Sequence, residues 1–179
     1  DTAFPKLAME AETSPPGAHG LLMLPYFSGE RTPIHDVHAK GAIFGLNLTH
    51  TRGDMYRALI EGIAHGTRHV TDTFAELGQS PARLLAVGGG TKNALWLQAT
   101  SDIPGIDQIV CEKTTGASYG DAFMAALAVG PVQRADIAKW NPIQQTIIAQ
   151  PSDTYDAAHT LFRRLYEQTK DIAADLNTL

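Results

Sequence analysis

The spacing of apolar residues predicts a long helix over residues 52–77. Thr51 precedes it with Asp54 three residues later, a pattern that caps helix starts, and Gly78 follows as a helix-ending residue. Because the apolar positions recur at helical intervals, they form one stripe along the helix. The stripe consists of Met55, Leu59, Ile63, Val70, Phe74 and Leu77.

Strand-like and helical runs alternate after this helix. Short apolar runs at 83–87 and near 107–112 predict strands, and helices are expected from about 92 to 101 and over 117–129. Such alternation is typical of a parallel α/β layer. The sequence therefore predicts an α/β fold with parallel strands flanked by helices.

Two elements complete the expected structure. The apolar run at 21–27 is a candidate short strand, and Ser152 is placed to cap a last helix. The apolar positions of that helix recur every three or four residues. They are Tyr155, Ala158, Phe162, Leu165, Thr169, Ile172 and Leu176.

Three segments lack clear periodicity. Residues 1–20 are rich in Pro, Gly and Ala and are interpreted as a mobile lead-in, which leaves 21–179 as the domain. Residues 28–50 are interpreted as a looped surface segment. Residues 130–151 are expected to be a connection, with Trp140 pinned against the body.

Two glycines interrupt the long helix. Gly62 and Gly66 each cost up to about 1 kcal/mol relative to alanine in a helix interior. Close approach by another backbone offsets such a cost. We therefore expect packing at these positions, with contact to a ligand as the alternative.

Composition places the chain among globular domains that do not bind nucleic acid. Its 179 residues are 44% hydrophobic and 18% charged, enough for one substantial core or two small ones. The net charge is −5, and there is no run of Lys or Arg to neutralise phosphates. Arg163 and Arg164 are interpreted as part of a solvated helix face. No stretch approaches 18 consecutive apolar residues, so no membrane span is expected.

The single cysteine and the N-terminal sequence indicate the cytoplasm. Cys111 cannot form an intramolecular disulfide, and its apolar neighbours favour a buried, unreactive thiol. The start, DTAFPKLAME, lacks the basic and apolar regions of a signal peptide. Because the chain does not begin with methionine, we expect it to be part of a longer protein.

The histidines do not predict a metal site. His65 and His69 lie four residues apart on the long helix, without the glutamate of the HExxH motif. His35 and His38 flank Asp36 in a loop, and spacing identifies no third ligand for either pair.

A triple glycine gives the strongest chemical signal. Gly88, Gly89 and Gly90 follow a predicted strand and precede a helix that has Asn93 near its first turn. Bare amides at a helix start suit a flat or negatively charged ligand, most obviously a nucleotide. A tight connection without a ligand is the alternative. The sequence matches neither GxxxxGK[ST] nor GxGxxG.

Beyond these patterns, residues 41–61, GAIFGLNLTHTRGDMYRALIE, resemble the second signature of the FGGY carbohydrate kinases. The preceding LLMLPYFSGERTPIHDVHAKG is similar to a segment of xylulokinase-like members, with Lys40 in place of the usual arginine. VGGGTKNALWLQATSD resembles the family's nucleotide segment, with Ser101 in place of alanine, and GASYGDAFMAALA resembles a later helix. The resemblance runs from about residue 15 to 175. The matching signature positions are Gly41, Ile43, Gly45, Leu46, Asp54, Met55, Ala58, Leu59, Ile60 and Glu61.

This resemblance implies an ATP- and Mg²⁺-dependent sugar kinase of the actin-like, ribonuclease-H-like superfamily, in which two lobes close on sugar and nucleotide. The chain resembles most of the second, nucleotide-binding lobe. By analogy Gly88, Gly89, Gly90 and Asn93 line the adenosine pocket. The family's catalytic aspartate and β-phosphate turns precede the region present here, so we expect no catalytic residue in this chain and no turnover by it alone.

The implied partners are a sugar, xylulose by preference, and the N-terminal lobe that this chain lacks. Ribulose, gluconate, glycerol or another polyol stay open as substrates, and an exposed apolar docking surface would favour a homo-oligomer. The alternatives to a kinase lobe are a nucleotide-binding module of the actin-like superfamily without sugar chemistry, and an interaction domain whose glycines only pack helices.

Two acidic residues, Asp102 and Glu61, resemble catalytic groups, and two charged residues of a loop are candidates for contact with the other lobe. For Asp102, helix capping or surface solvation is favoured over binding of magnesium. Glu61 lies among apolar residues, which favours a buried structural hydrogen bond. Glu30 and Arg31 lie in a loop that the family places near the cleft, so a lobe contact is expected.

Overall fold

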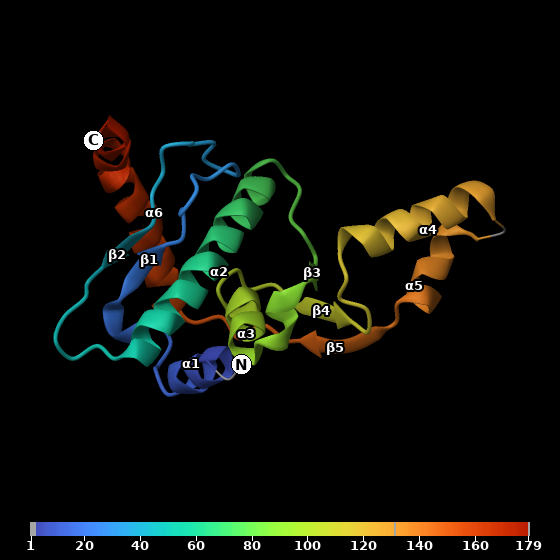
Figure 1. The fold of residues 1–179 in the computed structure, drawn as a ribbon, viewed down its shortest axis with the longest axis horizontal. Helices are drawn as coiled ribbons and strands as arrows, with labels where there is room; N and C mark the ends of the chain where they lie inside the picture. Colours follow the sequence, from blue (N-terminus) through green and yellow to red (C-terminus); the bar gives the residue numbers. More distant parts are fainter. Residues whose placement is uncertain (1–2, 131, 179) are drawn as a thin grey trace.

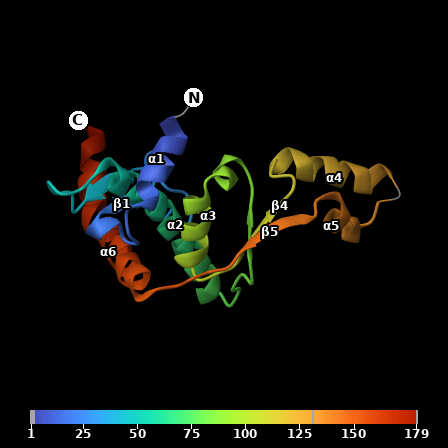
Figure 2. The same ribbon diagram turned by 90° about the horizontal axis from the view of Figure 1, so that it is seen from below.

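The computed structural model describes residues 3–130 and 132–178. Figures 1 and 2 show a body in which a two-stranded sheet lies against two helices, with two further helices packed on one of these, and a second sheet that leads away to a projecting arm. The body helices are α1 (Ala3–Glu12), α2 (Arg52–Glu76), α3 (Ala94–Asp102) and α6 (Asp153–Asp175). The arm carries α4 (Ala117–Val129) and α5 (Ile137–Trp140).

The first sheet pairs β1 (Leu22–Leu24) with β2 (Ala42–Phe44) in antiparallel register. The strand predicted over 21–27 is therefore confirmed, and β2 adds a short strand to the segment expected to be a loop. Tyr26 packs edge-on against Phe162 of α6, with ring centroids 6.0 Å apart. This contact is part of the main core, which joins the segment after β1 to α6.

The second sheet has the order β3-β4-β5. β3 (Leu84–Ala86) and β4 (Gln108–Cys111) are parallel, as predicted. β5 (Ile143–Ile147) pairs antiparallel with β4, so the prediction of a simple connection over 130–151 is wrong there. The sequence of β5, IQQTI, has too few apolar side chains for a strand pattern, because the strand is mostly exposed.

The long helix begins as its capping pattern predicts. Thr51 accepts a hydrogen bond from the Asp54 N–H, while the Asp54 side chain accepts from the Thr51 N–H, which forms a capping box. The expected apolar stripe, however, is wrong as a description of the buried face. Phe74 and Leu77 are exposed, and the buried face carries polar and small residues instead. Its members include Arg57, Ala58, Ile60, Glu61, Ala64, His65 and His69.

The lead-in is more regular than its composition predicts. Residues Ala3–Glu12 form α1, which packs against the start of α2 and buries Ala11 completely. Gly53 permits this packing, because a Cβ there would lie 2.5 Å from the Glu10 carbonyl oxygen. Arg52 and Glu10 also form an ion pair between the two helices. The prediction of a mobile lead-in is wrong for this helix, while the division into 1–20 and 21–179 stays a prediction.

The two interior glycines of α2 have different environments. A Cβ on Gly62 would lie 2.3 Å from the Met23 carbonyl oxygen, so the predicted backbone approach is confirmed there. At Gly66 an added Cβ would meet no atom within 4 Å, so the same prediction is wrong.

The arm packs mainly within itself. Trp140 lies edge-on against Phe123 of α4, with ring centroids 5.2 Å apart, and the Tyr119 hydroxyl donates to the Trp140 carbonyl. Trp140 is therefore held by α4 rather than by the body, which corrects the prediction. Short 3-10 turns at Ala18–Gly20, Gly89–Lys92, Arg134–Asp136 and Leu176–Thr178 complete the described structure.

The last helix, α6, begins as expected, with the Ser152 side chain accepting from the Tyr155 N–H. Tyr155, Phe162 and Leu165 of its predicted stripe are buried, whereas Ile172 near its end is exposed. Among the helices of the described residues, none combines the length and apolar character needed to cross a membrane.

Candidate functional site

The glycine turn connects β3 to α3. Gly88 has φ 84° and ψ −167°, a conformation that side-chain-bearing residues rarely adopt, and its N–H donates to the Thr114 carbonyl at 2.6 Å. The 3-10 turn Gly89–Lys92 follows. The N–H groups of Gly89 and Gly90 precede the carbonyls of this turn and have no partner within it. Among the described residues, no backbone carbonyl accepts a hydrogen bond from either N–H.

Asn93 ends the turn and starts the helix. Its side-chain oxygen accepts a hydrogen bond from the Trp96 N–H at 3.0 Å, which caps α3. Its amide nitrogen lies 3.5 Å from the Tyr56 hydroxyl of α2. Asn93 thus has a structural role that the sequence analysis did not foresee, in addition to lining a groove beside the turn.

Side chains do not fill the space around the turn. A Cβ built on Gly88 or Gly89 would meet no atom within 4 Å. On Gly90 it would lie 3.3 Å from the Trp96 ring. The turn is therefore open where a ligand would have to enter, and bordered by an aromatic ring.

One cavity lies between α1 and the turn, and we call it the α1 groove. Its volume is about 450 Å³. Aromatic and apolar side chains form most of its walls, and Lys92 adds a positive charge. A flat base with a phosphate chain suits this combination of aromatic rings, bare amides and a cation. The lining residues are Phe4, Pro5, Ala8, Tyr56, Gly89, Gly90, Lys92, Asn93 and Trp96.

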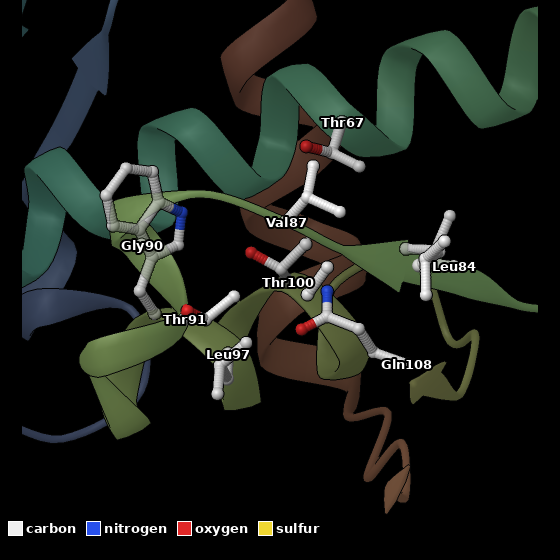
Figure 3. Close-up of a pocket in the computed structure, with 11 residues that line it drawn as sticks. Thr67, Leu84, Val87, Gly90, Thr91, Leu97, Thr100 and Gln108 are labelled. Atoms are coloured by element: carbon white, nitrogen blue, oxygen red, sulfur yellow. The ribbon is translucent and has the colours of Figure 1, made fainter. Parts of the chain in front are cut away.

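A second cavity of about 340 Å³ lies on the other side of Trp96, and we call it the β3 pocket. Figure 3 shows side chains from α2, β3, α3 and β4 converging on it. Trp96 and Gly90 border both cavities. The other lining residues are Thr67, Leu84, Leu85, Ala86, Val87, Thr91, Leu97, Thr100 and Gln108.

The structure gives Glu61 the structural role expected for it. Its buried carboxylate accepts hydrogen bonds from Arg57 Nε at 2.7 Å, from the Tyr155 hydroxyl at 3.1 Å and from the Gly17 N–H. Burial raises the pKa of Glu61, although these donors oppose the shift. The group ties α2 to α6 and to the segment after α1.

Asp102 is buried, so surface solvation, one of the two alternatives favoured for it from the sequence, is wrong. Its Oδ1 accepts from the Gln98 side-chain amide and from the Gln150 N–H, both at 2.7 Å. It therefore joins α3 to the segment before α6, at the end of the helix remote from the glycine turn.

The loop containing Glu30 and Arg31 borders a third, open cavity of about 490 Å³. Glu30 pairs with Asp36 through two backbone hydrogen bonds of 2.8 Å, which close the loop. The predicted lobe contact by Glu30 and Arg31 stays a prediction.

The histidines of α2 lie in the core. His65 and His69 are buried on the face that packs against α6, where His65 meets His159 with ring centroids 5.4 Å apart. In residues 3–130 and 132–178, no three His, Cys, Asp or Glu side chains are arranged to hold a metal ion.

Several groove residues were missed in the sequence. Phe4 lies in the segment interpreted as a lead-in, and Tyr56 lies one position from the expected stripe of α2. Trp96 and Lys92 lie within VGGGTKNALWLQATSD, the segment that resembles the family's nucleotide segment. Their closeness in sequence to the three glycines could have identified them as groove residues.

Comparison with known proteins identifies the family. A sequence model of the FGGY family of carbohydrate kinases, C-terminal domain, matches residues 1–129. The chain is similar to the xylulose kinase of Bacillus subtilis, with 32% identity over 180 residues and 98% of this chain. It spans only 36% of that relative's length.

Solved structures share the fold. The xylulose kinase of Rhodospirillum rubrum superposes with a TM-score of 0.84 and 31% identity, over 96% of this chain and 35% of that one. The glycerol kinase of Plasmodium falciparum, solved with ADP, gives a TM-score of 0.77 and 25% identity over 92% of this chain and 33% of that one. The expected actin-like α/β fold is thereby confirmed. The chain belongs to the FGGY family of carbohydrate kinases and carries that family's C-terminal domain.

Proposed function

We propose that this chain supplies the nucleotide-binding lobe of an ATP-dependent sugar kinase, which transfers the γ-phosphoryl of ATP to a hydroxyl of a ketose or polyol. Xylulose is the preferred acceptor, because xylulose kinases are among the relatives that align along nearly the whole chain. The observation that carries the proposal is the open glycine turn, whose unobstructed amides border the α1 groove.

In this proposal the nucleotide lies in the α1 groove rather than in the β3 pocket. The groove contains Gly89, Gly90 and Asn93, and Lys92 at its edge can pair with a phosphate. Gly88 does not line the groove, and its role is to turn the backbone immediately before Gly89. The base would lie among the aromatic side chains of the groove.

Phosphoryl transfer also needs in-line positioning of the acceptor, charge neutralisation and a group that accepts the proton. The α1 groove has no carboxylate in its lining, so its residues do not fit Mg²⁺, which prefers oxygen ligands. We therefore assign no Mg²⁺ ligand to this chain. Its contribution is to bind and orient the nucleotide.

The proposed partners of this lobe are the sugar and an N-terminal lobe that completes the cleft. We place the enzyme in the cytoplasm, in keeping with a single cysteine, and keep a homo-oligomer as a further proposal.

Purified 1–179 mixed with ATP and D-xylulose should give no sugar phosphate in a coupled ADP assay. Turnover would show that the catalytic groups are present in this chain.

Thermal unfolding with and without ADP tests the nucleotide site. Ligand at 100 times its dissociation constant stabilises a protein by about 2.7 kcal/mol, which raises the melting midpoint by several degrees. Gly89→Leu should abolish this rise, because Gly89 lines the α1 groove and a Cβ there has open space around it, so the larger side chain would compete with the nucleotide.

The matched control is Gly66→Ala, which adds a side chain in open space on α2 and should retain the full response to ADP. No midpoint shift of the unmodified chain at millimolar ADP would favour an interaction domain whose glycines only pack helices. An equal response in the Gly89 and Gly66 variants would instead place the nucleotide elsewhere.

A further inference from the structure

The α1 groove has few polar groups with which to tell one purine base from another. Adenine and guanine share the N7 acceptor and differ at C6, where adenine carries an amino donor and guanine a carbonyl acceptor. A site that selects adenine by hydrogen bonding therefore needs an acceptor held in place for the amino group. Such an acceptor would have to come from the side chains or the main chain of the groove.

Most side chains of the groove accept no hydrogen bond. Phe4, Pro5 and Ala8 of α1 are apolar. Lys92 and Trp96 carry N–H groups, which only donate. From these five side chains a base receives stacking, apolar contact and donated hydrogen bonds, but no acceptor for the adenine amino group.

The two side-chain oxygens among the described lining residues do not form a fixed acceptor. Asn93 Oδ1 accepts the Trp96 N–H at 3.0 Å, so it is committed to the cap of α3. The Tyr56 hydroxyl lies 3.5 Å from Asn93 Nδ2. Because a phenolic hydroxyl both donates and accepts, that of Tyr56 can pair with the adenine amino group or with the guanine carbonyl. Neither oxygen therefore selects one base.

The main chain of the glycine turn is equally tolerant. Among the described residues, the N–H groups of Gly89 and Gly90 have no main-chain acceptor, while the Gly90 carbonyl already accepts from the Asn93 N–H at 3.0 Å. The two N–H groups are donors, and adenine and guanine both carry the N7 acceptor. A phosphate oxygen accepts such hydrogen bonds as well. Hydrogen bonds from the turn thus do not depend on which purine is bound.

The size of the groove does not exclude guanine either. Guanine exceeds adenine by a single non-hydrogen atom, whereas the groove has a volume of about 450 Å³ and open space around Gly89. Aromatic rings of Phe4, Tyr56 and Trp96 line it. Stacking on such rings uses the π-face that every base has, so it favours flat bases in general.

We propose that this lobe holds the base by its faces rather than by its hydrogen-bonding edge, so that guanine and hypoxanthine nucleotides bind about as well as adenine nucleotides. GTP and ITP then replace ATP as phosphoryl donors. The inference rests on the proposed function, because it takes the α1 groove as the nucleotide site. Its aromatic rings stack on the base, and Lys92 with the glycine N–H groups holds the phosphates.

Calorimetric titration of the purified chain with ADP, GDP, IDP and inorganic pyrophosphate tests the proposal. IDP has the C6 carbonyl of guanine without its second amino group. We expect the three nucleotides to have dissociation constants within about tenfold of one another, because a site that pairs with one polar group rejects an analogue lacking it by about 10⁴-fold or more. Pyrophosphate, which has no base to stack, should bind at least about 5 times more weakly than ADP.

Phe4→Ala removes one stacking ring, and Met9→Ala is its matched control. Both residues lie on α1 and are 69% and 68% exposed, but Met9 does not line the groove. Phe4→Ala should weaken ADP and GDP by the same factor, about 5-fold or more, while Met9→Ala should weaken neither. Tyr56→Phe keeps the ring and removes the hydroxyl, so it should leave the ratio of the ADP and GDP dissociation constants unchanged.

Binding of ADP more than about tenfold tighter than that of GDP would overturn the proposal and leave the nucleotide site in place. A changed ratio in Tyr56→Phe would overturn it too, since the hydroxyl would then distinguish the bases. Equal affinities for pyrophosphate and ADP, or an unaltered affinity in Phe4→Ala, would show that the base is not stacked in this groove. Absence of binding by all three nucleotides would overturn the proposed function, and this inference with it.

Discussion

Two buried histidines should make the fold sensitive to mild acid. His65 of α2 and His159 of α6 are 2% and 5% exposed. Burial lowers the pKa of His65 to about 3, with His159 and Arg68 adding to the shift. Burial, and to a smaller extent Arg68, lowers the pKa of His159 to about 4. Asp72 opposes this lowering: its carboxylate lies 3.2 Å from His159 Nε2, although the two groups are not aligned as a hydrogen bond.

The direction follows from proton binding. Both pKa values lie below about 6.5, the ordinary value in an unfolded chain, so between about pH 4 and 6.5 the unfolded state binds more protons. Stability is therefore complete above pH 6.5 and falls as the pH decreases below it. At pH 5 each histidine lowers the free energy of unfolding by about 2 kcal/mol, which gives roughly 4 kcal/mol for the pair. That is a large fraction of the 5 to 15 kcal/mol typical of a domain.

Urea unfolding of the isolated chain at pH 7 and pH 5 measures this loss. His65→Phe should reduce the loss by about half, because the new ring next to Phe162 cannot take a proton. His38→Ala, at an exposed loop position, should leave the loss unchanged. Most carboxylates titrate below this window. Glu61 is the exception, because burial raises its pKa, and it opposes the loss since the folded state then binds its proton more readily than the unfolded state. Equal stability at the two pH values, or an unchanged loss in His65→Phe, would refute the reasoning.

Substitutions at four further positions test the packing around the site. Gly62→Ala should destabilise the chain by more than about 1 kcal/mol in thermal unfolding, because the new Cβ would collide with the Met23 carbonyl of β1. In the same assay Gly66→Ala should be neutral or stabilising by up to about 1 kcal/mol, because its Cβ would meet no other atom. Glu61→Gln should cost about 3 to 5 kcal/mol in urea unfolding, since it leaves the buried Arg57 charge uncompensated; a loss below 1 kcal/mol would show that the pair is dispensable. Asn93→Ala should lower the free energy of unfolding by about 1 kcal/mol, because it removes the helix cap. Asn93→Ser should retain most of the capping stability, since serine also caps helices. Equal losses of stability in the two variants would exclude a capping role.

The sequence predicts the site better than the packing around it. The turn from Gly88 to Asn93 is one continuous segment, so its conformation depends on local constraints that glycine and a capping residue express directly. The capping box of α2 was predictable for the same reason. The groove itself was not, because Phe4 and Tyr56 come together only through the packing of α1 on α2.

Burial patterns fail where polar groups are paired in the core. On α2 the buried face holds Arg57 and Glu61 because they satisfy each other, while the apolar Phe74 lies exposed. An apolar stripe cannot reveal this, since apolar periodicity does not report hydrogen-bond partners. β5 escaped prediction because its pairing with β4 depends on a partner distant in sequence.

Trp96 borders both the α1 groove and the β3 pocket. The chain has only one other tryptophan, Trp140, which lies on the arm. Replacing Trp140 with phenylalanine would therefore leave a single indole whose fluorescence responds to events on either side of it. Quenching by an added nucleotide can then be followed directly, without attaching a dye.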